Sequence, residues 1–120
     1  MAKKILLIED YPATVEMIIA FLEPQGYSLD FAFDGQSGLD KMAASKPDLV
    51  LLDIMLPGMS GLEVCRKMKA DPKLAKIPIV VVSAKVTSDD IKAGLSAGAD
   101  EYLVKPFEMK QLLDLIKKHI

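Results

Sequence analysis

The sequence predicts an α/β fold: a doubly wound (βα)5 three-layer sandwich around a central five-stranded parallel sheet. Two observations predict it. Five short apolar runs recur along the chain, and segments with the period of an amphipathic helix lie between them. Alternating strands and helices favour parallel strands joined by right-handed crossovers. With 120 residues, 51% of them hydrophobic, the chain can bury one core, so we expect a single domain over residues 1–120.

The five predicted strands are rich in apolar or aromatic side chains. They are KKILLI (3–8), YSLDFA (27–32), DLVLL (48–52), IPIVVVS (77–83) and DEYLV (100–104). Three of them contain the nearly continuous apolar runs ILLI, LVLL and IVVV, which are typical of parallel strands covered by helices on both faces. We therefore expect the sheet to be central and buried.

The predicted helices are marked by apolar periodicity and by their end residues. Stripes at helical spacing are formed by Val15, Ile18, Ile19 and Leu22, by Leu62, Cys65 and Met68, and by Met109, Leu112, Leu113, Ile116 and Ile120. The expected end signals are Pro12 in a first turn, Thr87 and Asp90 at capping-box spacing, and Gly98 as a left-handed helix end.

The composition excludes several function classes. There are 17 acidic and 15 basic side chains, and the lysines are scattered, which argues against direct binding of nucleic acid. No apolar run approaches the roughly 20 residues of a membrane helix. Cys65 is the single cysteine, and no charged-then-apolar leader precedes Ile5, so we expect a cytoplasmic protein without disulfides.

Chemically active side chains follow four of the predicted strands. Glu9 and Asp10 come after the first strand, Asp53 after the third, Ser83 ends the fourth and Lys105 follows the fifth. The carboxyl ends of parallel strands share one edge of the sheet, where open α/β folds place their ligands. We therefore expect these side chains to converge into one pocket.

Three carboxylates in one pocket repel one another unless a cation lies among them. Oxygen ligands without His or Cys favour Mg²⁺, or Mn²⁺ as a substitute, and Mg²⁺ often shares its shell with a phosphate. Lys105 supplies a positive charge suited to phosphate and Ser83 a hydrogen-bond donor. The pocket thus suits phosphoryl chemistry, with Asp53 on the central strand as the candidate carboxylate nucleophile.

With these residues in place, the sequence resembles, over essentially its whole length, the receiver domain of two-component response regulators, also called CheY-like. The resemblance is carried by ILLIED (5–10), LLDIMLPGMSGLEVCR (51–66), PIVVVSA (78–84) and GADEYLVKPF (98–107). It implies a flavodoxin-like sheet with strand order 2-1-3-4-5. It also implies a phosphorylation-activated signalling module that switches its surface for partner binding.

The resemblance also implies roles for single residues. Asp53 would accept a phosphoryl group from a histidine kinase or phosphotransfer protein in a Mg²⁺-dependent reaction. Glu9 and Asp10 would help hold the metal together with Asp53, and the backbone carbonyl of Met55 would complete its shell. Lys105 would neutralise the phosphate.

Two further positions match the family's switch residues, Ser83 and Tyr102. The family also implies a cis peptide bond between Lys105 and Pro106. Its usual docking face comprises the fourth helix, fifth strand and fifth helix, where the partner is a downstream protein or a second copy in a homodimer. His119 has no Ser or Asp at a plausible spacing, and we assign it no role.

Other function classes fit the sequence less well. A phosphatase of the haloacid dehalogenase type needs a second Asp two residues after the nucleophile, where this chain has Met55, so we expect a phosphoacceptor rather than a turnover enzyme. A flavin or nucleotide binder needs a phosphate-cradling loop after the first strand, whereas EDYPAT (9–14) is acidic. A degenerate receiver acting as a scaffold or dimerisation module is the remaining alternative.

Overall fold

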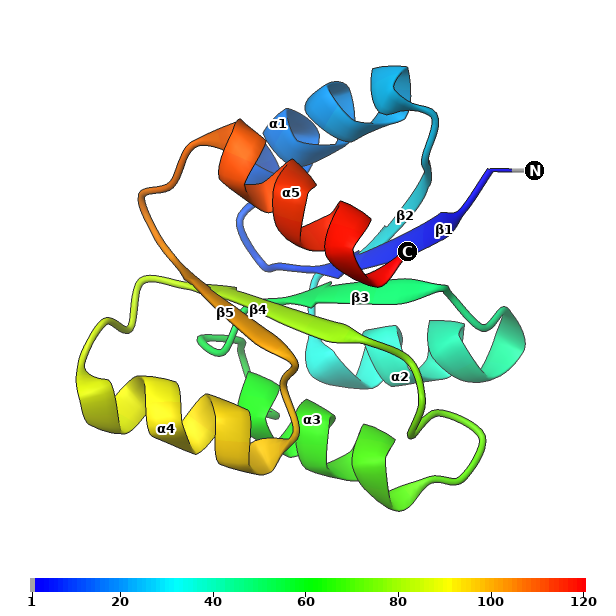
Figure 1. Ribbon diagram of the computed structural model, residues 1–120. Coiled ribbons are helices and arrows are strands. Elements are labelled where there is room, and N and C mark those ends of the chain that lie inside the picture. The colour runs from blue at the N-terminus through cyan, green and yellow to red at the C-terminus, as the bar shows by residue number, and fades with distance from the viewer. Residues whose placement is uncertain (1) are drawn as a thin grey trace.

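The computed structural model describes residues 2–120, which contain a parallel sheet with strand order β2-β1-β3-β4-β5 (Figure 1). The strands are β1 (Lys4–Ile8), β2 (Ser28–Ala32), β3 (Leu49–Leu52), β4 (Ile79–Ser83) and β5 (Glu101–Val104). The helices are α1 (Pro12–Leu22), the 3-10 turn η1 (Glu23–Gln25), α2 (Gly35–Ala44), α3 (Gly61–Ala70), α4 (Ser88–Ala97) and α5 (Met109–His119). The predicted fold class and strand order are confirmed.

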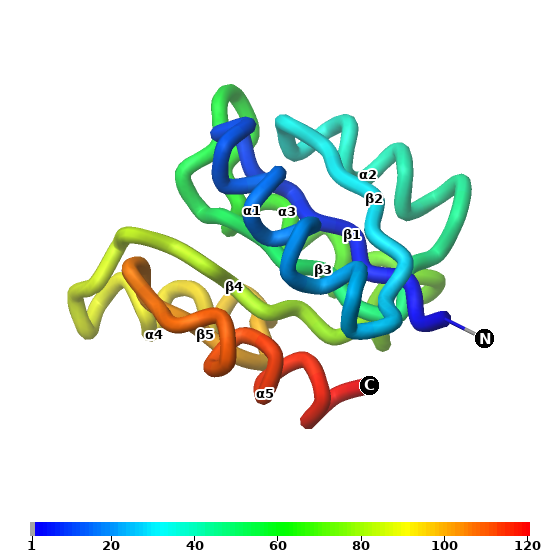
Figure 2. The backbone as a smooth tube through the Cα atoms, turned by 90° about the horizontal axis from the view of Figure 1, so that it is seen from above, coloured from blue at the N-terminus to red at the C-terminus, as the bar shows by residue number. Residues whose placement is uncertain are grey.

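The helices form one layer on each face of the sheet. Figure 1 shows α1 and α5 above it and α2, α3 and α4 below it, and Figure 2 views the α1 and α5 side from above. Along β1, Ile5 and Leu7 pack into the core under α1 and α5, whereas Leu6 and Ile8 pack into the core over α2 and α3. This alternation follows from the two-residue period of a strand. The sheet is therefore covered on both faces, as its apolar runs predicted.

Local signals set the helix ends as expected. Pro12 occupies the first turn of α1, Thr87 and Asp90 form a capping box at α4, and Gly98 ends α4 with a φ of 120°. At α4, the capping box and the Gly98 N–H satisfy backbone groups that a helix end leaves without partners, whereas Pro12 simply has no N–H to satisfy at the start of α1. Within residues 2–120, no helix is both long enough and apolar enough to span a membrane.

Candidate functional site

The site lies where β1, β3, β4 and β5 end at one edge of the sheet, and the sheet order makes these strands neighbours. Three backbone hydrogen bonds extend the pairing between neighbouring strands by one residue beyond the C-terminal ends of β1, β3 and β5. Glu9 N–H donates to the Ala32 carbonyl at 3.0 Å, Asp53 N–H to Ile8 at 3.0 Å and Lys105 N–H to Ser83 at 2.9 Å. The sheet itself thereby holds Glu9, Asp53 and Lys105 in fixed positions at its edge.

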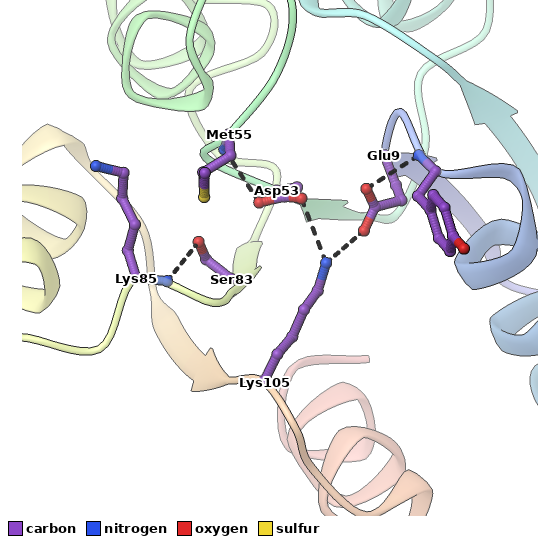
Figure 3. A network of polar contacts seen from close by, with 7 residues as sticks. Glu9, Asp53, Met55, Ser83, Lys85 and Lys105 are labelled. Carbon is purple, nitrogen blue, oxygen red and sulfur yellow. Dashed lines mark hydrogen bonds and ion pairs between the residues drawn. The ribbon is translucent and has the colours of Figure 1, made fainter.

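Lys105 joins the two buried carboxylates (Figure 3). Its Nζ lies 2.6 Å from Glu9 Oε1 and 3.3 Å from Asp53 Oδ2. Glu9 is only 3% exposed and Asp53 only 7%. Buried charges are tolerated when they are paired and hydrogen-bonded, so one ammonium supplies the positive charge that both carboxylates require.

Burial and pairing shift two pKa values in this cluster. Burial raises the pKa of Glu9, the negative charge of Asp53 adds to this, and the contact with Lys105 opposes it. For Lys105, burial lowers the pKa, but the hydrogen bond to Glu9 and the charges of Asp53 and Glu9 outweigh burial, so its pKa is raised. Lys105 therefore stays protonated and keeps its charge at the site.

The turn after β3 orients the Asp53 side chain. The backbone N–H of Met55 donates to Asp53 Oδ1 at 3.1 Å. Gly58 has a φ of 70°, which favours glycine, and a β-carbon on Gly61 would collide with the Asp53 carbonyl oxygen. The close return of α3 to the end of β3 thus depends on Gly61.

Glu9, Asp10 and Asp53 come together as the sequence predicted. Each offers a carboxylate oxygen, and these oxygens lie within 4.8 Å of one another. An all-oxygen, negatively charged set of this kind fits a hard cation such as Mg²⁺. Met55 lies beside Asp53 in Figure 3, and the role of its carbonyl as a further ligand stays a prediction.

The predicted switch residues meet at the backbone of Lys85. Ser83 is fully buried, and its Oγ accepts a hydrogen bond from Lys85 N–H at 3.2 Å. The Tyr102 hydroxyl donates to the Lys85 carbonyl at 2.8 Å. Sequence reasoning missed this link because it runs through backbone atoms, which no side-chain pattern reports. The peptide bond between Lys105 and Pro106 is cis, as expected.

Known proteins share this fold and much of this sequence. The chain is 39% identical over 120 residues, all of this chain and 51% of the relative's length, to the DNA-binding response regulator MtrA of Mycolicibacterium smegmatis. It thus spans about half the length of this curated relative. The chemotaxis protein CheY4 of Vibrio cholerae superposes with a TM-score of 0.93 at 25% identity, covering 100% of both chains.

A third similar protein is described together with a metal. It is the receiver domain of the sensor histidine kinase PA1611 from Pseudomonas aeruginosa, with a magnesium ion coordinated in the active site cleft. Its TM-score is 0.91 at 28% identity, over 99% of this chain and 98% of that one. The response regulator receiver domain family itself matches residues 5–117, which include Glu9, Asp53 and Lys105. The chain therefore belongs to the response regulator receiver domain family.

Proposed function

We propose that this chain is a phosphorylation-activated signalling receiver in which Asp53 accepts a phosphoryl group from a histidine kinase or phosphotransfer protein. The observation that carries the proposal is the position of the Asp53 carboxylate. It lies at the end of the central strand, within reach of the Lys105 ammonium and beside Glu9 and Asp10. A nucleophile, a counter-charge and a potential metal site thus share one edge of the sheet.

In the proposed reaction a phosphoryl group is transferred from a histidine nitrogen of the donor to a carboxylate oxygen of Asp53. A carboxylate oxygen of Asp53 forms a bond to phosphorus while the bond from phosphorus to the donor's histidine nitrogen breaks, and that nitrogen keeps the electron pair. Lys105 stabilises the negative charge on the phosphoryl oxygens, and the Ser83 hydroxyl can donate a hydrogen bond to one of them. Hydrolysis of the acyl phosphate releases inorganic phosphate and returns the Asp53 carboxylate. Met55 stands where a phosphatase of the haloacid dehalogenase type needs its second Asp, which favours a phosphoacceptor over a turnover enzyme.

Glu9, Asp10 and Asp53, with the Met55 carbonyl, would hold Mg²⁺ or Mn²⁺. When bound, the cation would supply positive charge that offsets the carboxylates and the phosphoryl oxygens. Support comes from the oxygen-only donor set and from the Pseudomonas receiver domain described with magnesium. The residues of this chain orient the acceptor, because Met55 N–H and Lys105 hold the two oxygens of Asp53 in place.

Signalling would follow from a change at Ser83. A phosphoryl group on Asp53 adds strong acceptors near the Ser83 hydroxyl, whose oxygen accepts from Lys85 N–H in the structure. Moving Ser83 disturbs Lys85, whose carbonyl holds Tyr102. The change would thereby reach the surface of α4, β5 and α5, where a downstream protein or a second copy of the chain would bind.

We propose no nucleic-acid contact for residues 1–120 themselves, whose net charge is -2. The DNA binding named for the mycobacterial relative belongs to a protein of which this chain matches 51%. DNA binding would be relevant to this chain only if the chain were part of a longer DNA-binding response regulator.

The deciding experiment is the intact mass after incubation with a small-molecule phosphodonor, with and without Mg²⁺, on wild type and Asp53→Asn. We expect one phosphoryl group on wild type with Mg²⁺ and none on Asp53→Asn or without metal. If the folded, metal-replete wild type gains none from this donor or from a phosphohistidine protein, the proposal fails. The alternative, a degenerate receiver serving as a scaffold or dimerisation module, would then be favoured.

A further inference from the structure

Gly94 of α4 lies against the aromatic ring of Tyr102. Gly94 is buried, and a β-carbon on this residue would lie 2.9 Å from both Cδ2 and Cε2 of the ring. Separations under 3.0 Å are essentially never seen for real β-carbons, so an alanine here requires one of the two partners to move. The next atom that such a β-carbon would approach is Ile54 Cδ1, at 3.7 Å.

The backbone of α4 gives no other reason for glycine at this position. The glycines with positive φ are Gly26, Gly58 and Gly98, so Gly94 has a conformation open to any residue. Inside a helix, glycine is less favourable than alanine. The close approach of the Tyr102 ring is therefore the feature of the structure that requires glycine here.

Gly94, Ile54 and the Lys85 carbonyl together form what we call the Tyr102 slot. The ring lies against Gly94, and the hydroxyl donates to the Lys85 carbonyl at 2.8 Å. Ile54 is 4% exposed and directly follows Asp53 in the chain. Lys85 N–H in turn donates to Ser83 Oγ, a contact visible in Figure 3. Two sides of the slot are thus connected to the candidate phosphorylation site.

We propose that Gly94 is a positioning residue for Tyr102: its missing side chain lets the ring enter the slot and the hydroxyl reach the Lys85 carbonyl. The inference rests on the proposed function, in which the movement of Tyr102 carries the signal. An alanine would close the slot. The ring would turn away in preference to a shift of α4, because Tyr102 is only half-buried while the capping box at Thr87 and the buried Ala97 hold the helix.

The test follows the Tyr102 ring directly in the resting protein. The chain has three tyrosines, so labelling with fluorotyrosine gives three ¹⁹F resonances, and Tyr102→Phe assigns one of them. We expect Gly94→Ala to shift the Tyr102 resonance and to leave those of Tyr11 and Tyr27 in place. A Tyr102 resonance that stays at its wild-type position in Gly94→Ala would overturn the proposal.

A matched control separates the slot from helix stability. Ser96 lies in the same helix and its side chain is exposed, and Ser96→Ala also replaces a weaker helix former by alanine. It should leave the Tyr102 resonance unchanged. A shift in Ser96→Ala equal to that in Gly94→Ala would mean that a more stable α4, and not a filled slot, moves the ring, and would likewise overturn the proposal.

A double-mutant cycle provides a second, independent measurement. With the ring removed by Tyr102→Ala, Gly94→Ala should raise the folding equilibrium constant about fourfold through helix propensity. With the ring present, the same substitution should give a smaller gain or a loss, because the new methyl group displaces the ring. Equal changes in both backgrounds would show that Gly94 and Tyr102 do not interact.

Phosphorylation then distinguishes this proposal from the proposed function. In wild type, phosphorylation of Asp53 should move the Tyr102 resonance. In Gly94→Ala, with the ring already outside the slot, it should move the resonance less at equal phosphate incorporation. If phosphorylated wild type shows no change at Tyr102, the proposed switch fails, while the resting-state measurements still decide whether Gly94 positions the ring.

Discussion

Lys105 Nζ lies 2.6 Å from Glu9 Oε1, closer than its 3.3 Å to Asp53 Oδ2. The ammonium that the family resemblance assigns to phosphate is therefore paired first with a neighbouring carboxylate. Its side chain is 24% exposed, so water screens this contact in part. The pair nevertheless holds both buried carboxylates in a site that would otherwise have uncompensated negative charge.

The first prediction concerns removal of that positive charge. Lys105→Met should lower the free energy of unfolding in chelator by about 1–3 kcal/mol, because Glu9 and Asp53 lose their shared partner. Urea denaturation measures this change. The control is Lys110→Met on the exposed side of α5, which should change little. Equal stabilities for the two variants would show that the buried carboxylates do not depend on Lys105.

The second prediction concerns the acidic cluster and its cation. Without divalent metal, Asp10→Asn should raise the stability by a few tenths to about 1 kcal/mol, since it removes one of three clustered negative charges. Mg²⁺ at about 100 times its dissociation constant should stabilise wild type by about 2.7 kcal/mol. Thermal melts with chelator or Mg²⁺ should show a smaller gain for Asp10→Asn. The matched variant Asp114→Asn, exposed on α5, should respond to Mg²⁺ as wild type does.

The third prediction concerns pH and the pairing of β5 with the end of α5. Hydrogen bonds from His119 at 2.8 Å and Lys118 at 3.0 Å lower the pKa of Glu101 from its ordinary value of 4.5. A lowered pKa in the folded state contributes stability that is present above pH 4.5 and lost as the pH falls through the folded pKa. Between about pH 6 and pH 3, the melting temperature should fall less steeply for Glu101→Gln than for wild type. Parallel curves would rule out this contribution.

The fourth prediction concerns the thiol of Cys65. Cys65 belongs to α3, its side chain is buried in the core between that helix and the sheet, and burial raises the pKa of the thiol to about 11. Because the thiolate is the reactive form, native protein near pH 8 should react with a thiol reagent far more slowly than protein in denaturant. With an aromatic disulfide as the thiol reagent, the absorbance of the aromatic thiolate that it releases measures both rates. Similar rates in the two conditions would contradict the burial of Cys65.

Most of the fold could be predicted because its signals are local. The apolar runs predicted all five strands, but the first residue of each strand differs from the start of the predicted run, because backbone hydrogen bonding decides where a strand begins. The run from Ile77 forms β4 only from Ile79, because the preceding Pro78 accepts a hydrogen bond from Val50 N–H at 3.0 Å but has no N–H to donate. The run from Tyr27 likewise pairs only from Ser28. Side-chain patterns predict the existence of a strand better than its first residue.

The pairing of His119 shows what local signals miss. The sequence suggested no partner for it, yet its Nε2 lies 2.8 Å from Glu101 Oε2. The two residues are 18 positions apart and belong to α5 and β5. Their contact depends on how α5 packs back onto the sheet, which the spacing of polar residues does not describe.

The sequence by itself determined the alternation of strands and helices and the identity of the side chains at the strand ends. These follow from residue period and chain order, because parallel strands bring their carboxyl ends to one edge. Only the tertiary structure decided that Lys105 pairs first with Glu9, that Lys85 links Ser83 to Tyr102, and that Gly94 makes room for the Tyr102 ring. Such contacts join residues distant along the chain, and they depend on the packing of each helix against the sheet to within a fraction of an ångström.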